Sequence, residues 1–170
     1  MRVRNALKRA QQESLTNVVT GVPEGSLVDE ALQNALTRPD SVFQVVSLKN
    51  LDSFRETYGF VAADDLLRAV AIMIREAVRE LGGMDCFIGH LASVDFLVIT
   101  RQAHAAALKE RIRKRLEQSF NYFYSDQHRE EGVFAETPLA VQVNEVSHKT
   151  SDMHDLLKLK AELDYFLHSS

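Results

Sequence analysis

A chain of 170 residues is long enough to bury the core of one domain. Its composition, 45% hydrophobic and 26% charged, is that of an ordinary globular protein and leaves no room for a long low-complexity linker. The formal net charge of −4 gives no electrostatic reason to expect nucleic acid or an anionic membrane as a partner.

Cysteine usage and hydropathy predict the compartment. Cys86 is the one cysteine of the chain, so an internal disulfide is excluded. The longest apolar run, residues 69–74, is far too short to span a bilayer, and the N-terminus lacks the apolar core of a signal peptide. These features predict a cytoplasmic protein without membrane insertion.

The first fifteen residues are polar and favour a helix. One weak apolar stripe runs along it, formed by Val3, Ala6, Leu7 and Ala10. Two interpretations stay open: a solvated helix packed lightly on the domain, or the end of a signalling helix that joins an upstream sensor. We therefore separate residues 1–15, an N-terminal helix and possible signalling linker, from a domain over residues 16–170.

The elements of the first half follow from turn residues and apolar spacing. After a break at residues 20–23, Ser26 is expected to cap a helix over residues 27–36, with Asp29 in its first turn. Residues 42–48 are β-branched and apolar enough for a central strand. A long helix over residues 62–81 is predicted by a 3.6-residue apolar period, and two glycines end it.

The second half begins with a predicted hairpin over residues 86–100, whose two apolar runs flank a polar break at residues 92–95. A helix over residues 104–120, a loop-rich excursion over 121–137, a strand over 139–146 and a helix over 151–167 follow. This order predicts an α/β (α+β) fold, a mixed β-sheet flanked by helices with an antiparallel hairpin inside it.

Five short motifs, spaced along residues 17–139, resemble those of one family. Residues 17–23 (NVVTGVP) resemble Asp-x-Leu-Thr-Gly-Leu-Pro, and residues 47–60 (SLKNLDSFRETYGF) resemble Asp-Ile-Asp-x-Phe-Lys-x-Ile-Asn-Asp-x-Tyr-Gly-His. Residues 92–96 (ASVDF) stand where that family has Gly-Gly-(Asp/Glu)-Glu-Phe. Ala63-Asp64 and Pro138-Leu139 match two further motifs. Together they resemble the GGDEF domain of diguanylate cyclases, which implies a fold related to nucleotidyl cyclases and polymerase palms.

The metal-binding carboxylates of the family are replaced in this chain. Joining two GTP molecules needs Mg²⁺, a hard ion that carboxylates hold while it bridges phosphate oxygens. The resemblance places the two family carboxylates at Ser47 and Val94. A hydroxyl is a poor Mg²⁺ ligand and valine is none, so we predict no catalytic and no metal residues.

Further departures affect the nucleotide contacts that the resemblance implies. Ala92 and Ser93 replace the two glycines that let backbone amides approach a triphosphate, and Asp52 replaces a basic residue. Three vestigial nucleotide contacts are predicted: Asp64, which the resemblance assigns to guanine recognition, Arg55 in place of a guanine-reading Asn, and Asp95 as a lone acid. The family's inhibitory product site is absent, because its Arg and Asp positions are Gly83 and Cys86.

Several of these residues also have a purely local interpretation. Asp64 suits the first turn of a helix, where an acid favours the dipole, and Asp95 suits a turn. His90, beside Gly89, suits a half-buried structural histidine. The basic run 109–115 is either a solvated helix face or a site for an acidic partner.

The sequence leads to three functional hypotheses. The first is a degenerate, non-catalytic GGDEF domain that acts as a regulatory or protein-interaction module, with other signalling domains or a second copy of itself as partner. The second is a sensor that binds GTP or cyclic di-GMP without turnover. The third is a divergent diguanylate cyclase. No cofactor is expected, and Mg²⁺ and GTP only if a divergent site persists.

Overall fold

The computed structural model describes residues 15–147 and 156–168. The helix expected over residues 1–15 therefore falls almost wholly outside the described residues, as does the start of the helix expected over 151–167. The elements are α2 (Ser26–Leu36), β1 (Ser41–Lys49), α3 (Leu51–Tyr58), α4 (Phe60–Leu81), β2 (Phe87–Ala92), β3 (Asp95–Arg101), α5 (Gln102–Ser119), η1 (Phe120–Phe123), α6 (Asp126–Glu131), β4 (Ala140–Ser147) and α7 (Leu156–His168).

The four described strands form one sheet in the order β2-β3-β1-β4. The expected sheet flanked by helices is confirmed, but each neighbouring pair of these strands is antiparallel, so the sheet is not mixed as predicted. The reason lies in the hairpin. Strands β1 and β2 run in the same direction, and β3 lies between them, so they are never paired.

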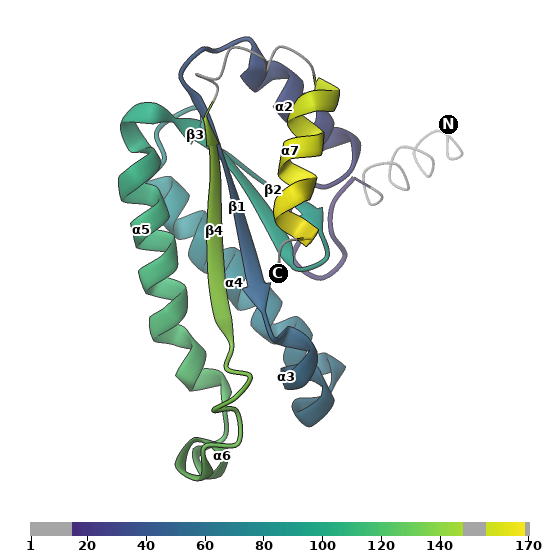
Figure 1. The fold of residues 1–170 in the computed structure, drawn as a ribbon, viewed down its shortest axis with the longest axis vertical. Coiled ribbons are helices and arrows are strands. Elements are labelled where there is room, and N and C mark those ends of the chain that lie inside the picture. The colour runs from purple at the N-terminus through teal and green to yellow at the C-terminus, as the bar shows by residue number, and fades with distance from the viewer. Residues whose placement is uncertain (1–14, 148–155, 169–170) are drawn as a thin grey trace, which may run out of the picture.

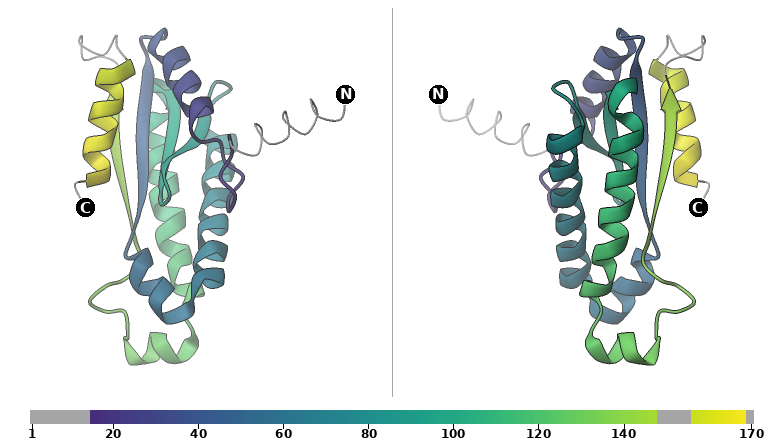
Figure 2. Two further views of the ribbon diagram at one scale, coloured as in Figure 1. Left: turned by 90° about the vertical axis from the view of Figure 1, so that its right-hand side faces the viewer. Right: turned by 90° about the vertical axis from the view of Figure 1, so that its left-hand side faces the viewer.

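Helices cover both faces of the sheet. Figures 1 and 2 show α7 on one face, with α2 beside it, and α4 and α5 on the opposite face. Side chains alternate along β1, so that Phe43 and Val45 pack under α2 and α7 while Val46 and Leu48 pack under α4 and α5. Because both faces are covered, eight of the nine residues of β1 are buried, including the polar residues Ser41, Gln44 and Ser47.

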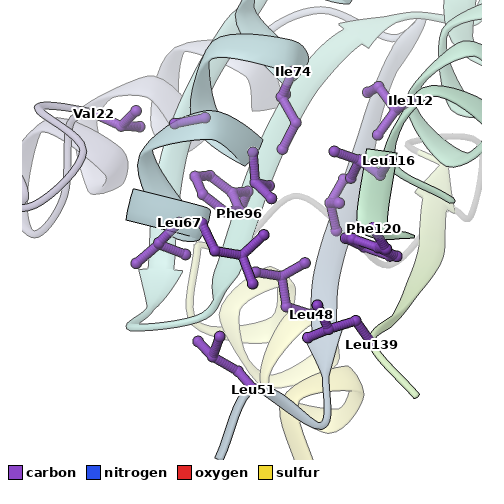
Figure 3. Close-up of a cluster of buried hydrophobic side chains, with 14 of the residues drawn as sticks. Val22, Leu48, Leu51, Leu67, Ile74, Phe96, Ile112, Leu116, Phe120 and Leu139 are labelled. Atoms are coloured by element: carbon purple, nitrogen blue, oxygen red, sulfur yellow. The ribbon is translucent and has the colours of Figure 1, made fainter. Parts of the chain in front are cut away.

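The larger of the two clusters lies between the sheet and the helices α4 and α5. Figure 3 shows Leu67 and Ile74 of α4, Ile112 and Leu116 of α5, and Phe96 of β3 converging there. Leu51 at the start of α3 belongs to the same cluster. The main core therefore extends to the turn that joins β1 to α3, and it holds that turn in place.

Three local predictions need correction. Ser26 does not cap α2: the N-cap is Gly25, whose φ of 62° suits a residue without a side chain, and Ser26 is the first helical residue. Helix α3 was not predicted, because it has only eight residues. The excursion contains the short helix α6, capped by Ser125, whose side chain accepts a hydrogen bond from the His128 amide.

Candidate functional site

A cavity of about 400 Å³ opens where β1 turns into α3. It is lined by Leu48, Lys49, Asn50, Leu51, Asp52, Ser53, Val94, Asp95 and Leu167. The first six form the β1–α3 turn, Val94 and Asp95 belong to the β2–β3 turn, and Leu167 comes from α7. This is the place where the sequence comparison put the family's metal and phosphate contacts.

The β1–α3 turn is built on a left-handed residue. Asn50 has φ 66° and is the one non-glycine residue with positive φ in the described chain. Its side-chain amide donates a hydrogen bond to the carbonyl oxygen of Pro138 at 2.6 Å. The turn is therefore fixed by its own backbone conformation and by a contact to the segment that precedes β4.

The strands bring Ser47 and Asp95 together inside the protein. The two residues are partners in the β1–β3 register, and the Ser47 hydroxyl donates to a carboxylate oxygen of Asp95 at 2.5 Å. Both are buried, and Asp95 lies on the same face of β3 as Leu97 and Ile99, which pack under α2 and α7. The Ser47 hydroxyl stands where the family has a metal-binding carboxylate, and it donates its hydrogen bond to the neighbouring carboxylate of Asp95.

The residue at the other metal position takes part in packing. Val94 is partly buried against the main core, and its carbonyl oxygen accepts a hydrogen bond from the Leu48 amide at 3.2 Å. Its side chain offers no oxygen to a cation. One carboxylate that already accepts a hydrogen bond, one hydroxyl and one valine do not form the oxygen cage that Mg²⁺ needs. The residues present therefore do not fit the family's metal.

The charged residues that line the cavity are two acids, Asp52 and Asp95, and one base, Lys49, a balance that is unfavourable for a triphosphate. Asp52 lines the cavity with a side chain that is 92% exposed, and it forms an ion pair with Arg55 at 2.9 Å. The Arg55 guanidinium also lies 5.6 Å from the ring centre of Phe60, the first residue of α4. Arg55 is thus not among the residues that line the cavity.

Asp64 also lies away from this cavity. Helix α4 begins at Phe60, so Asp64 is in its second turn, and the expectation of a first-turn acid is wrong. Within the described chain Asp64 has no hydrogen bond or ion pair, and its side chain is partly exposed. Of the three vestigial contacts predicted, only Asp95 lines the cavity, whereas Leu167 lines it and was not foreseen.

His90 is a structural residue, as its local interpretation predicts. It is buried, stacks on Phe96 with ring centres 4.3 Å apart, and places Nε2 2.7 Å from the Thr20 hydroxyl. Its Nδ1 lies 3.2 Å from the carbonyl oxygen of Ala92. Burial lowers the pKa of His90 below its ordinary value of 6.5. The imidazole therefore links the loop that precedes α2 to the β2–β3 turn in its neutral form.

Lowering the pH is expected to reduce the free energy of unfolding, because His90 becomes protonated. Because the pKa is lower in the folded than in the unfolded state, its contribution is complete above pH 6.5 and is lost as the pH falls through the folded value. We expect His90→Gln to reduce the free energy of unfolding more at pH 7.5 than at pH 5.5, measured by urea denaturation. An equal loss at both pH values would contradict this assignment.

No cluster of three or more His, Cys, Asp or Glu side chains is found within residues 15–147 and 156–168. The three arginines of the basic run on α5 are paired: Arg111 with Glu80 at 2.6 Å, Arg113 with Glu110 and Glu117, and Arg115 with Glu76. The run joins α5 to α4. None of the described helices is both long and apolar enough to cross a membrane.

Comparison with known proteins agrees with this fold. The coiled coil and GGDEF domain of DgcB from Caulobacter crescentus, in complex with c-di-GMP, aligns with a TM-score of 0.66 and 15% identity over 96% of this chain and 85% of that one. A diguanylate cyclase/phosphodiesterase from Caldicellulosiruptor saccharolyticus aligns with a TM-score of 0.64 and 14% identity, over 92% and 86%.

The diguanylate cyclase SiaD from Pseudomonas aeruginosa, in complex with its activator SiaC, aligns with a TM-score of 0.63 and 16% identity, over 99% of this chain and 64% of that one. At these identities the likeness establishes the fold alone. No curated protein matches the chain significantly. The family model described as "Diguanylate cyclase, GGDEF domain" matches residues 14–158. Since this match spans most of the chain, the chain belongs to the GGDEF domain family.

Proposed function

We propose that this chain is a non-catalytic GGDEF domain that acts as a regulatory, protein-interaction module in bacterial cyclic di-GMP signalling. The buried Ser47–Asp95 hydrogen bond is the observation that carries the proposal, because it uses the remaining acid of the site for cohesion between strands. Val94 packs at the second metal position, and Asp52 adds negative charge at the mouth of the cavity. Each change opposes binding of Mg²⁺ and triphosphate.

The proposed signalling role and partners are suggested by proteins of similar structure. DgcB is described in complex with c-di-GMP, and SiaD in complex with a protein activator. We propose other signalling domains or a second copy as partners here, with residues 1–15 as the connecting helix. A cytoplasmic location is part of the same proposal. It agrees with Cys86, which is the one cysteine of the sequence and is not in a disulfide.

A second candidate is a sensor that binds GTP or cyclic di-GMP without turnover. The cavity of about 400 Å³ at the β1–α3 turn favours it, because space remains at the place where the family binds nucleotide. The vestigial contacts do not converge on this cavity, since Asp64 and Arg55 lie outside its lining. We therefore rank the sensor below the interaction module.

An assay of turnover tests the proposal. The purified chain, incubated with GTP and Mg²⁺, is expected to form no cyclic di-GMP above the background of a heat-inactivated sample, because two metal ligands are missing. An active diguanylate cyclase in parallel shows that the conditions permit the reaction. Sustained production that Ser47→Ala or Asp95→Asn abolishes would overturn the proposal and establish a divergent cyclase.

A further inference from the structure

The excursion over residues 120–138 is a built part of the protein, fixed to α3 by a cluster of rings. Figure 1 shows α6 of this excursion at one end of the long axis, below α3 and α5. Tyr124 and Phe134 stack with ring centres 4.7 Å apart, and Tyr58 of α3 lies 5.8 Å from Phe134 and 5.4 Å from His128. Phe54 of α3 completes the cluster at 4.8 Å from Tyr58.

Hydrogen bonds hold the excursion at both ends of α3. The Tyr58 hydroxyl lies 2.6 Å from Nδ1 of His128 and accepts a hydrogen bond from the Ser125 amide at 3.0 Å. At the other end, the Asn50 amide holds the carbonyl oxygen of Pro138. Because Asn50 also lines the cavity at the β1–α3 turn, this residue connects the excursion to the candidate site.

The excursion combines a cavity with exposed apolar side chains. A cavity of about 360 Å³ is lined by the stacked rings of Tyr124 and Phe134 together with Asn121, His128, Arg129, Gly132, Ala135 and Pro138. Tyr122 is 83% exposed and Val133 49% exposed. The excursion therefore offers an apolar side chain of a partner both this cavity and the exposed side chains of Tyr122 and Val133 as contacts.

The excursion is also acidic. It contains Asp126, Glu130, Glu131 and Glu136 against one guanidinium, that of Arg129, so its formal charge is four negative and one positive, or −3. The Arg129 guanidinium already forms an ion pair with Asp126. Glu130 and Glu136 are exposed and have no ion pair to the residues that the structure describes. A partner segment that fits this surface is therefore basic and amphipathic.

One segment of the chain has this composition. Residues 2–9 hold Arg2, Arg4, Lys8 and Arg9 without an acid, and Val3 and Leu7 stand four positions apart. The other basic run, 109–115, is interrupted by Glu110, and its three arginines are already paired with glutamates of α4 and α5. The described chain begins near α2 and β2, away from α6, which favours contact between two molecules over contact within one (Figures 1 and 2).

We infer that the acidic excursion is a docking surface for residues 2–9 of a second copy of this chain. The inference rests on the proposed interaction function and gives it a surface. Exposed ion pairs are individually weak and are screened by salt, so association is expected to be weak at low ionic strength and to be lost at high ionic strength. Docking at the excursion would act on α3, and through Asn50 on the candidate site.

Sedimentation velocity of the full chain, at about 10–300 µM and at low and high salt, tests the inference. The unmodified chain is expected to associate at low salt and to be monomeric at roughly 0.5 M salt. Glu130→Lys with Glu136→Lys, and separately Arg4→Glu with Arg9→Glu, should each weaken association at least tenfold. Combining the two pairs of reversals in one chain should restore it.

Controls separate electrostatics from misfolding. Glu162→Lys with Asp164→Lys on α7 changes the net charge by the same amount at exposed positions and is expected to leave association intact. Glu130→Gln with Glu136→Gln should weaken it without introducing a positive charge. A monomer under all conditions, or association that ignores the excursion variants, would overturn the inference. Neither result depends on GTP turnover, so failure here is distinguishable from failure of the proposed function.

Discussion

Replacing Phe54 with alanine is expected to cost about 3–5 kcal/mol of the free energy of unfolding, measured by urea denaturation. Phe54 is 2% exposed and belongs to the main core. It also contacts the rings of Tyr58 and Tyr124, which join α3 to the excursion. The substitution therefore removes a buried ring and leaves a cavity beneath the candidate site.

The matched control for this prediction is Val61→Ala on the neighbouring helix α4. Val61 is 76% exposed, so its truncation is expected to change the free energy of unfolding by no more than about 0.5 kcal/mol. Limited proteolysis of Phe54→Ala should cut first within residues 120–138, because that segment loses the contact between Tyr124 and the Phe54 ring of α3. A loss of stability below about 1 kcal/mol would show that α3 is not packed as described.

The second large effect concerns the buried pair of Ser47 and Asp95. Ser47→Ala is expected to cost about 1.5–3 kcal/mol, because it leaves a buried carboxylate without its hydroxyl donor. In the background of Asp95→Ala the same change should cost less than about 0.5 kcal/mol. The resulting coupling energy, measured by a double-mutant cycle, is then well above zero.

Ser41→Ala provides a control of the same chemistry. Ser41 is equally buried in β1, but its hydroxyl donates to a neutral acceptor, the carbonyl oxygen of Ala35, at 2.8 Å. The loss of a neutral hydrogen bond is expected to cost about 0.5–1.5 kcal/mol. If Ser47→Ala costs no more than Ser41→Ala, and does so independently of residue 95, the carboxylate is not held as the structure indicates.

Long, strongly periodic elements could be predicted from the sequence. The strand expected over residues 42–48 is β1 at Ser41–Lys49, and the helix expected over 62–81 is α4 at Phe60–Leu81. In both elements the apolar side chains occupy the buried positions, so the element can be recognised from the sequence pattern. Helix α3 was missed because its eight residues form few apolar repeats of their own. What places it is the packing of Phe54 and Tyr58 against rings about 70 residues later in the chain, which no local pattern contains.

The candidate site could be predicted only in part, because its contacts also join residues that are far apart in the sequence. Comparison of motifs placed Ser47 and Val94 at the metal positions, but their surroundings follow from strand register and from distant segments. The Ser47–Asp95 bond needs β3 to pair with β1 at one register, and Leu167 reaches the cavity from a helix that follows β4. The antiparallel order of the sheet likewise depends on where the hairpin inserts, since β3 separates two strands of the same direction.

Calorimetric titration of the purified chain with GTP, with and without Mg²⁺, tests the central claim most directly. The account predicts no heat of binding in either titration at millimolar GTP, since Ser47 and Val94 do not hold the metal and Asp52 puts an acid where the family has a basic residue. Binding that requires Mg²⁺ would contradict it, because the residues described here would then hold a metal after all. Binding without Mg²⁺ would contradict it in favour of the sensor.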